Sequence, residues 1–171
     1  AGAATGVMAS YNLVNGRPAT VDPDFAGLVR DWSDRPLFNV SDAGAPYNLT
    51  RSQQYYATQP EANAAVLKAG LDSFTVDDGN GAPTVTAIKA ALAEGLLAES
   101  DVDAAAVHAL NIRFRLGEFD PDGGPYASIG ADVIDSPAHR RLARETAGKA
   151  TVLLKNSRNA LPLKPGGKLA G

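Results

Sequence analysis

Short apolar runs alternate with amphipathic helical stretches along the first 117 residues, and this alternation restricts the fold more than any other feature. The expected short strands span residues 6–11, 37–41 and 71–76. The expected helices span residues 23–32, 60–68, 83–94 and 100–115. Because strands that alternate with helices form a parallel sheet with the helices outside, the chain is predicted to be an α/β protein.

Capping residues mark where several of these elements begin and end. Asp22 followed by Pro23 is an N-cap with proline at the first helical position. Ser100 has the capping-box spacing to Asp103, and Gly117 is placed to stop the helix that they begin. Three strand–helix units are too few for a closed eight-stranded barrel, which needs about 250 residues, so the pattern predicts an incomplete barrel.

The last third of the chain has a different character. Residues 118–136 are rich in proline and glycine and show no periodicity, which indicates a linker. Ser136 followed by Pro137 predicts a helix to about Lys149, and residues 151–155 are predicted to form a strand.

Charge and composition exclude several classes of function. The chain has 16 Lys and Arg against 19 Asp and Glu, a net charge of −3 without a basic run, so nucleic acid is not an expected partner. The chain has no cysteine, which excludes disulfides, thiolate zinc sites and cysteine nucleophiles. No apolar run approaches the roughly 18 residues that span a bilayer, so no membrane partner is expected. His108 and His139 stand isolated on expected helices, so no metal site is predicted.

Polar residues follow the predicted strands at three places. In a parallel α/β protein, reactive groups lie on the loops after the carboxyl ends of the strands, which here are residues 8–12, Asp42 and the pair Asp77–Asp78. A carboxylate at a strand end can attack the anomeric carbon of a sugar and form a glycosyl-enzyme intermediate. Asp42 fits this role, although an N-cap for the next segment explains the same residue. Asp77 and Asp78 fit either a neighbouring substrate contact or a solvated turn.

Five ordered segments carry a resemblance to a known family. They read GVMASYNLVNGRPA, LVRDWSDRPLFNVSDAGA, ATQPEANAAVLKAGLD, FRLGEFDPDGGPY and HRRLARETAGKATVLLKNSRNALPL. This series, from Gly6 to Leu163, closely resembles glycoside hydrolase family 3, in particular its xylosidase-like and glucosidase-like members.

The resemblance implies a fold and a division into domains. Residues 1–117 are expected to be the C-terminal part of a (β/α)8 TIM-type catalytic barrel, 118–136 an interdomain linker, and 137–171 the start of an α/β sandwich domain. The N-terminus AGAATGVMASYN has neither an initiating methionine nor a basic signal region, so we expect the chain to be a piece of something longer.

The resemblance also implies an activity. The complete enzyme would be a retaining exo-acting β-glycosidase that removes one sugar from a non-reducing end, needs no cofactor, and acts on a small oligosaccharide or β-glycoside. The order of the FDP…PY and HRRLAR segments is closest to the xylosidase-like branch, so β-xylosides are the first expectation and β-glucosides the second.

Family motifs place three site residues. The nucleophile of the family is the Asp of its V-S-D motif, which corresponds to Asp42 here. The M-x-S-Y-N segment of the family lines the −1 sugar subsite, and in this chain it contains Met8 and Tyr11. Tyr11 would hydrogen-bond the nucleophile or flank the sugar ring, with core packing as the alternative, and ordinary packing equally explains Met8. Ala43 stands where many family members have Trp or Cys, so the leaving-group side should be roomier.

Other residues that the family needs are not expected within these segments. The acid/base Glu of the family lies in the domain after the barrel, beyond Leu163, and the residues that grip the sugar hydroxyls lie on earlier barrel strands. The remainder of the parent enzyme is therefore an expected partner, and this chain alone is expected to be inactive. Two alternatives remain at this point: a non-catalytic carbohydrate-binding or scaffold module of the same fold, and a self-sufficient small α/β domain with an unrelated role.

Overall fold

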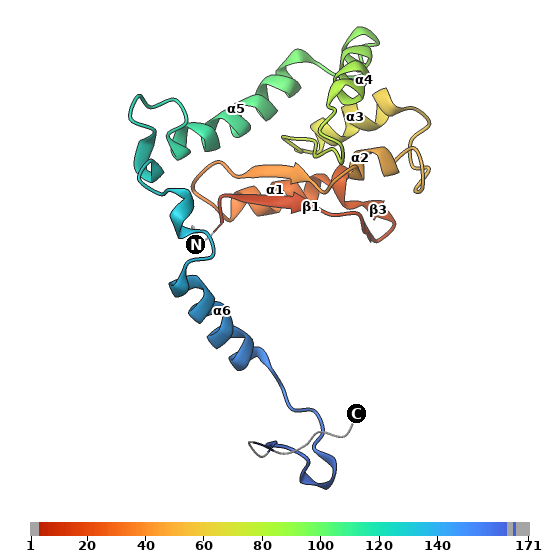
Figure 1. The fold of residues 1–171 in the computed structure, drawn as a ribbon. Helices are drawn as coiled ribbons and strands as arrows, with labels where there is room; N and C mark the ends of the chain where they lie inside the picture. Colours follow the sequence, from red (N-terminus) through yellow and green to blue (C-terminus); the bar gives the residue numbers. More distant parts are fainter. Residues whose placement is uncertain (1–3, 164–165, 167–171) are drawn as a thin grey trace. The chain divides into compact units, whose positions relative to one another are not determined.

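The computed structural model describes residues 4–163 and 166 (Figure 1). The chain divides into two compact units, residues 1–126 and 127–171, which are described separately. The division falls after Tyr126, inside the segment 118–136, and the domain bounds expected from the family stay a prediction.

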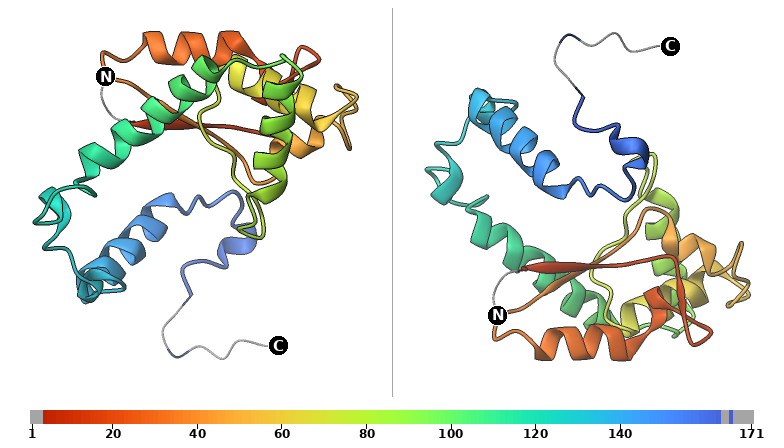
Figure 2. Two further views of the ribbon diagram at one scale, coloured as in Figure 1. Left: turned by 90° about the horizontal axis from the view of Figure 1, so that it is seen from above. Right: turned by 90° about the horizontal axis from the view of Figure 1, so that it is seen from below.

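Two parallel strands joined through a helix form the centre of the first unit. Strand β1 (Gly6–Ala9) pairs in parallel with β4 (Phe38–Ser41), in a register that sets Gly6 opposite Phe38 and Ala9 opposite Ser41. Helix α1 (Pro23–Asp31) makes the connection and runs alongside the strand pair in both views of Figure 2. The Asp22 side chain accepts a hydrogen bond from the Asp24 N–H at 3.1 Å, which confirms the predicted cap.

A small hairpin separates β1 from α1. Strands β2 (Leu13–Val14) and β3 (Arg17–Pro18) are antiparallel, and a short 3₁₀ helix (Ala19–Val21) follows them. The turn between them is Asn15-Gly16, both with positive φ, as a tight hairpin requires.

The predicted strand at residues 71–76 is reduced to a single bridge. Ser73 pairs in parallel with Val40 of β4, and the Ser41 N–H donates to the Ser73 carbonyl at 3.0 Å. Beyond this point a side chain replaces the ladder, because the Thr75 N–H donates to the Ser41 hydroxyl at 3.0 Å. The segment still runs beside β4 in the direction that was predicted, but it is not a regular strand.

Four further helices complete the first unit. They are α2 (Ala45–Asn48), α3 (Gln59–Lys68), α4 (Ala82–Ala93) and α5 (Glu99–Leu116). The predicted capping box of α5 is wrong in its position: the helix begins one residue earlier, and the Asp101 carboxylate accepts from the Ala98 N–H at 3.0 Å. Gly117, with φ of +79°, ends α5 as expected because this left-handed conformation favours glycine.

Helix α3 packs into both clusters of the apolar core. One cluster comprises Ala9, Val21, Leu49, Ala62, Val66 and Leu71, and the other comprises Ala64, Leu67, Ala91, Leu97 and Ala105. The first cluster includes Ala9, the last residue of β1, so the burial of α3 helps to hold the carboxyl end of that strand. Parallel strands connected by helices confirm the α/β class, while the assignment to one part of a barrel remains a proposal.

The second unit contains one long helix, α6 (Pro137–Ala150). Ser136 caps it, accepting from the His139 N–H at 3.3 Å. The predicted strand at residues 151–155 is absent: these residues have no regular secondary structure and are exposed, and no described residue of this unit is buried. A strand needs a hydrogen-bonded neighbour, and the described part of the unit offers none.

Candidate functional site

The three segments singled out by sequence end at the same edge of the first unit. The Asp42 N–H donates to the Ala9 carbonyl of β1 at 2.9 Å. On the other side, the Gly44 N–H donates to the Thr75 carbonyl at 2.9 Å. Because all three segments run in parallel, their carboxyl ends bring the residues around Tyr11, Asp42 and Asp77 together.

Asp42 is half-buried directly after β4, and its backbone is held on both sides. Its carboxylate accepts a hydrogen bond from the N–H of the next residue, Ala43, at 2.7 Å. It does not cap the following helix: the N-cap of α2 is Gly44, with φ of +66° and no side-chain cap. The alternative explanation of Asp42 as an N-cap is therefore wrong, because its carboxylate does not cap the helix that follows the strand.

Tyr11 lies beside Asp42. Its hydroxyl donates to the Ala43 carbonyl at 2.5 Å, and its own carbonyl accepts from Gln53 Nε2 at 2.9 Å. Desolvation raises the pKa of the Tyr11 phenol above its usual value, and the negative charge and hydrogen bonding of Asp42 and the charge of Asp77 raise it further. The phenol therefore stays protonated as a hydrogen-bond donor next to two carboxylates.

Met8 and Tyr11, the two other site residues implied by the family resemblance, are both exposed. Met8 is 52% exposed and Tyr11 is 45% exposed, so core packing does not explain them in the described residues. Met8 of β1 is paired with Val40 of β4, and Val40 lies two residues before Asp42. Their contact with a sugar stays a prediction.

A hollow of about 430 Å³ opens next to these residues. It is lined by Tyr11, Ala43, Gly44, Tyr47, Asn48, Arg51 and Asp77. Sequence reasoning missed Tyr47 and Arg51, which follow Asp42 and are four residues apart, a helical spacing that sets two side chains on one face. A larger hollow, about 510 Å³, is lined by residues of the β2–β3 hairpin and α1 and contains none of the strand-end residues predicted for the site.

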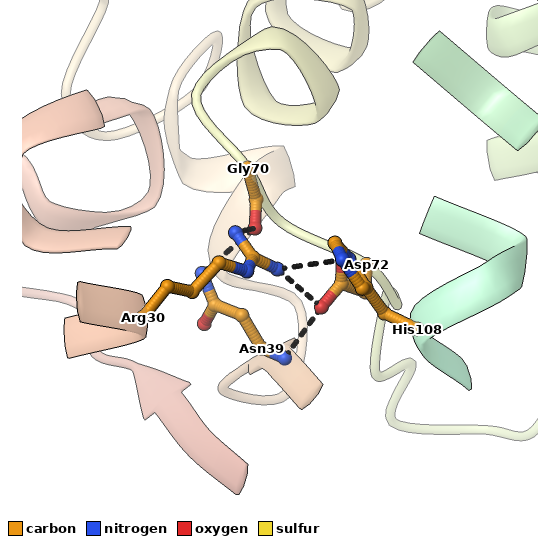
Figure 3. A network of polar contacts seen from close by, with 5 residues as sticks. All are labelled: Arg30, Asn39, Gly70, Asp72 and His108. Carbon is orange, nitrogen blue, oxygen red and sulfur yellow. Dashed lines mark hydrogen bonds and ion pairs between the residues drawn. The ribbon is translucent and has the colours of Figure 1, made fainter. Parts of the chain in front are cut away.

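A second polar cluster lies at the opposite end of β4, where Asp72 is almost fully buried (Figure 3). One Asp72 carboxylate oxygen accepts from Arg30 Nη2 at 2.6 Å and from the Asn39 N–H at 2.7 Å. The other lies 2.8 Å from His108 Nδ1, which is also 3.2 Å from Arg30 Nη2. His108, expected to be isolated, is thus a partner of a buried carboxylate.

The same cluster ties separate elements together. The Gly70 carbonyl accepts from Arg30 Nη1 at 3.0 Å and from Asn39 Nδ2 at 3.1 Å. The cluster therefore joins α1, β4, α5 and the segment after α3. Its member on β4, Asn39, lies three residues before Asp42. The cluster positions the strand that carries the candidate nucleophile and lies apart from the strand-end edge.

Within residues 4–163 and 166, no three His, Asp or Glu side chains gather closely enough to hold a metal ion. None of the described helices is both long and apolar enough to cross a bilayer.

Comparison with known proteins places this geometry in a family. No family model matches the chain. β-D-Xylosidase 1 of Arabidopsis thaliana is 39% identical over 165 residues, which are 96% of this chain and 21% of that protein. A probable exo-1,4-β-xylosidase of Aspergillus fumigatus is 37% identical over 169 residues, again 96% of this chain and 21% of the relative.

Solved structures agree with the sequence relatives. A glycoside hydrolase family 3 exo-β-xylosidase, solved with a xylobiose aziridine probe, has a TM-score of 0.79 and 28% identity over 95% of this chain and 21% of that one. A β-glucosidase of Listeria innocua, solved with isofagomine, has a TM-score of 0.74 and 28% identity over 94% of this chain and 22% of that one. The chain is a fragment of a protein like those of glycoside hydrolase family 3. It spans about a fifth of the length of these family 3 relatives.

Proposed function

We propose that this family 3 fragment belongs to a retaining, exo-acting β-glycosidase in which Asp42 is the nucleophile. The observation that carries the proposal is the position of Asp42: half-buried at the carboxyl end of β4, relieved of any helix-capping duty, and at the edge where the neighbouring strand ends converge. Relatives named as β-xylosidases and β-glucosidases support the same class of reaction.

The proposed reaction proceeds in two displacements. The ionised Asp42 carboxylate attacks the anomeric carbon, and the bond to the leaving oxygen breaks as an acid from another part of the protein protonates that oxygen. Water then attacks the same carbon, giving up a proton to the same acid/base group and releasing Asp42 and a sugar of retained configuration. In retaining enzymes the two carboxyl groups stand about 5–5.5 Å apart.

Tyr11 and Met8 would border the sugar in this scheme. The Tyr11 phenol, kept protonated beside Asp42, is suited to hydrogen-bond a carboxylate or a sugar oxygen. Met8 has an exposed apolar side chain and is paired with Val40, which lies two residues before Asp42. We propose β-xylosides as the first substrate class, with β-glucosides second, because curated relatives with both high identity and nearly full coverage of this chain are named as β-xylosidases.

The proposal has a direct chemical test. The full-length protein is treated with a 2-deoxy-2-fluoro β-xyloside, which slows breakdown of the glycosyl-enzyme, and is then digested and mapped by mass spectrometry. The label is expected on the peptide containing Asp42, and Asp42→Asn should prevent labelling.

Other labelling results would contradict the proposal. A label on Asp77 or Asp78 would mean that the nucleophile assignment is wrong. An active wild-type protein that never traps the fluoro sugar would argue against a covalent intermediate. Sugar binding without hydrolysis would favour the non-catalytic carbohydrate-binding module.

A further inference from the structure

Two hollows near the strand-end edge share three lining side chains. The hollow of about 430 Å³ next to Tyr11 and a second of about 250 Å³ share Tyr47, Arg51 and Asp77 in their linings. The shared residues therefore lie between the two hollows, which together are called the depression here, and the first hollow is bordered by Tyr11 and Ala43, the neighbours of the proposed nucleophile. Ala43 contributes only a methyl group to its rim, so that no large side chain closes it on that side.

The Tyr47–Arg51 pair forms a fixed platform in this depression. The Tyr47 hydroxyl is 2.9 Å from the hydroxyl of Thr84, a buried residue of α4, which holds the ring in place. The Arg51 guanidinium lies over that ring, 5.0 Å from its centroid, and the Arg51 N–H donates to the Tyr47 carbonyl at 3.2 Å. Among the described residues no acidic side chain pairs with Arg51, so its N–H donors remain available.

Asp77 is placed on the other side of the depression by the shape of the strand-end loop. A Cβ on Gly44 would lie 3.1 Å from the Asp77 carboxylate, so the glycine makes room for it. Gly44 also has φ of +66°, a conformation that disfavours other residues. Asp77 and Tyr11 line the same hollow, and the charge of Asp77 contributes to the raised pKa of the Tyr11 phenol.

From this arrangement we infer that Arg51 and Asp77 bind the hydroxyl groups of the leaving-group sugar, which makes the site selective for oligosaccharides over aryl glycosides. A guanidinium donates and a carboxylate accepts, and sugar hydroxyls do both, so the two side chains together match a neutral sugar. The inference rests on the proposed function, because it takes Asp42 to mark the position of the bond that is cleaved.

The test compares two substrates that form the same glycosyl-enzyme. In the full-length protein, kcat/KM is measured for xylobiose and for 4-nitrophenyl β-xyloside, whose leaving group has no sugar hydroxyls. Losing a hydrogen bond that involves a charged group should lower the ratio of the xylobiose value to the aryl value by about tenfold or more in Asp77→Asn and in Arg51→Gln. Both side chains are exposed, so the variants should keep the wild-type fold, which circular dichroism checks.

Matched controls use exposed residues away from the depression. Asp34→Asn and Arg35→Gln make the same chemical changes and should leave the ratio at the wild-type value. If the ratio in Asp77→Asn and Arg51→Gln stays within about twofold of wild type while Asp42 is still labelled, the inference is wrong and the proposed function stands. If the wild-type protein hydrolyses neither substrate, the proposed function fails and the inference falls with it.

Discussion

Replacement of Asp72 by asparagine is the sharpest test of how the structure holds the strand of the candidate nucleophile. The substitution keeps the size of the side chain and removes its charge. The carboxylate accepts from Arg30 and from the backbone N–H of Asn39, His108 Nδ1 lies 2.8 Å from it, and only 2% of the Asp72 side chain is exposed. An asparagine turns its NH₂ group toward one of these donors and leaves Arg30 without its counter-charge.

The expected cost follows from the burial of the partners. Breaking a buried ion pair by removing one member costs about 3–5 kcal/mol. The Arg30 and His108 side chains are 25% and 27% exposed, so each can regain some hydration, which favours the lower end of the range. A loss of about 3 kcal/mol corresponds to a roughly 150-fold rise in the population of the opened state.

Hydrogen exchange measures this opening where it should occur. In the full-length protein, amide exchange in peptides covering residues 37–41 and 71–76 is followed by mass spectrometry for wild type and Asp72→Asn. The matched control is Asp135→Asn, because Asp135 also pairs with an arginine, Arg140, but at an exposed site, where the pair should contribute little. A rise of less than about threefold in Asp72→Asn, or an equal rise in the control, would refute the argument that this cluster pins the strand.

Two further predictions concern the strand-end edge and the chain itself. Gly44→Ala should destabilise the loop by about 1 kcal/mol, because Gly44 has a left-handed backbone, and should displace the Asp77 carboxylate. The control is Gly27→Ala, at an exposed helical glycine with open space around it. Equal shifts in melting temperature in the two variants would contradict this prediction. The isolated 171-residue chain should not turn over aryl β-xylosides or β-glucosides, because no acid/base partner of Asp42 is expected within it; steady turnover on the order of 1 per second or more would refute this.

Local patterns predicted much of the first unit. The apolar runs at 6–11 and 37–41, the cap at Asp22 and the stop at Gly117 all concern residues a few positions apart, and the structure confirms the elements that they mark. The position of Asp42 at a strand end followed from the same local signals. The parallel pairing of β1 with β4 followed from their alternation with helices.

Long-range contacts decided what local patterns could not. The segment 71–76 is predicted to be a strand, yet the Thr75 N–H donates to the Ser41 hydroxyl in place of a backbone carbonyl of β4, and the segment is not a regular strand. The run at 151–155 has no neighbouring strand in the described part of its unit, so its apolar sequence alone does not make one. In both cases the outcome depended on a partner distant in sequence, which periodicity does not report.

The sequence by itself determined the α/β class, the order of the elements and the carboxylate at the end of β4, because helix period, caps and turns act over a few residues. Only the tertiary structure brought Asp72 of one segment to His108 of another, and Arg51 and Asp77 to one hollow beside Tyr11. Such contacts join residues 26 to 66 positions apart in the chain, and they form in a unit whose helix α3 packs into both apolar clusters. Spacing along the chain carries no information on those distances.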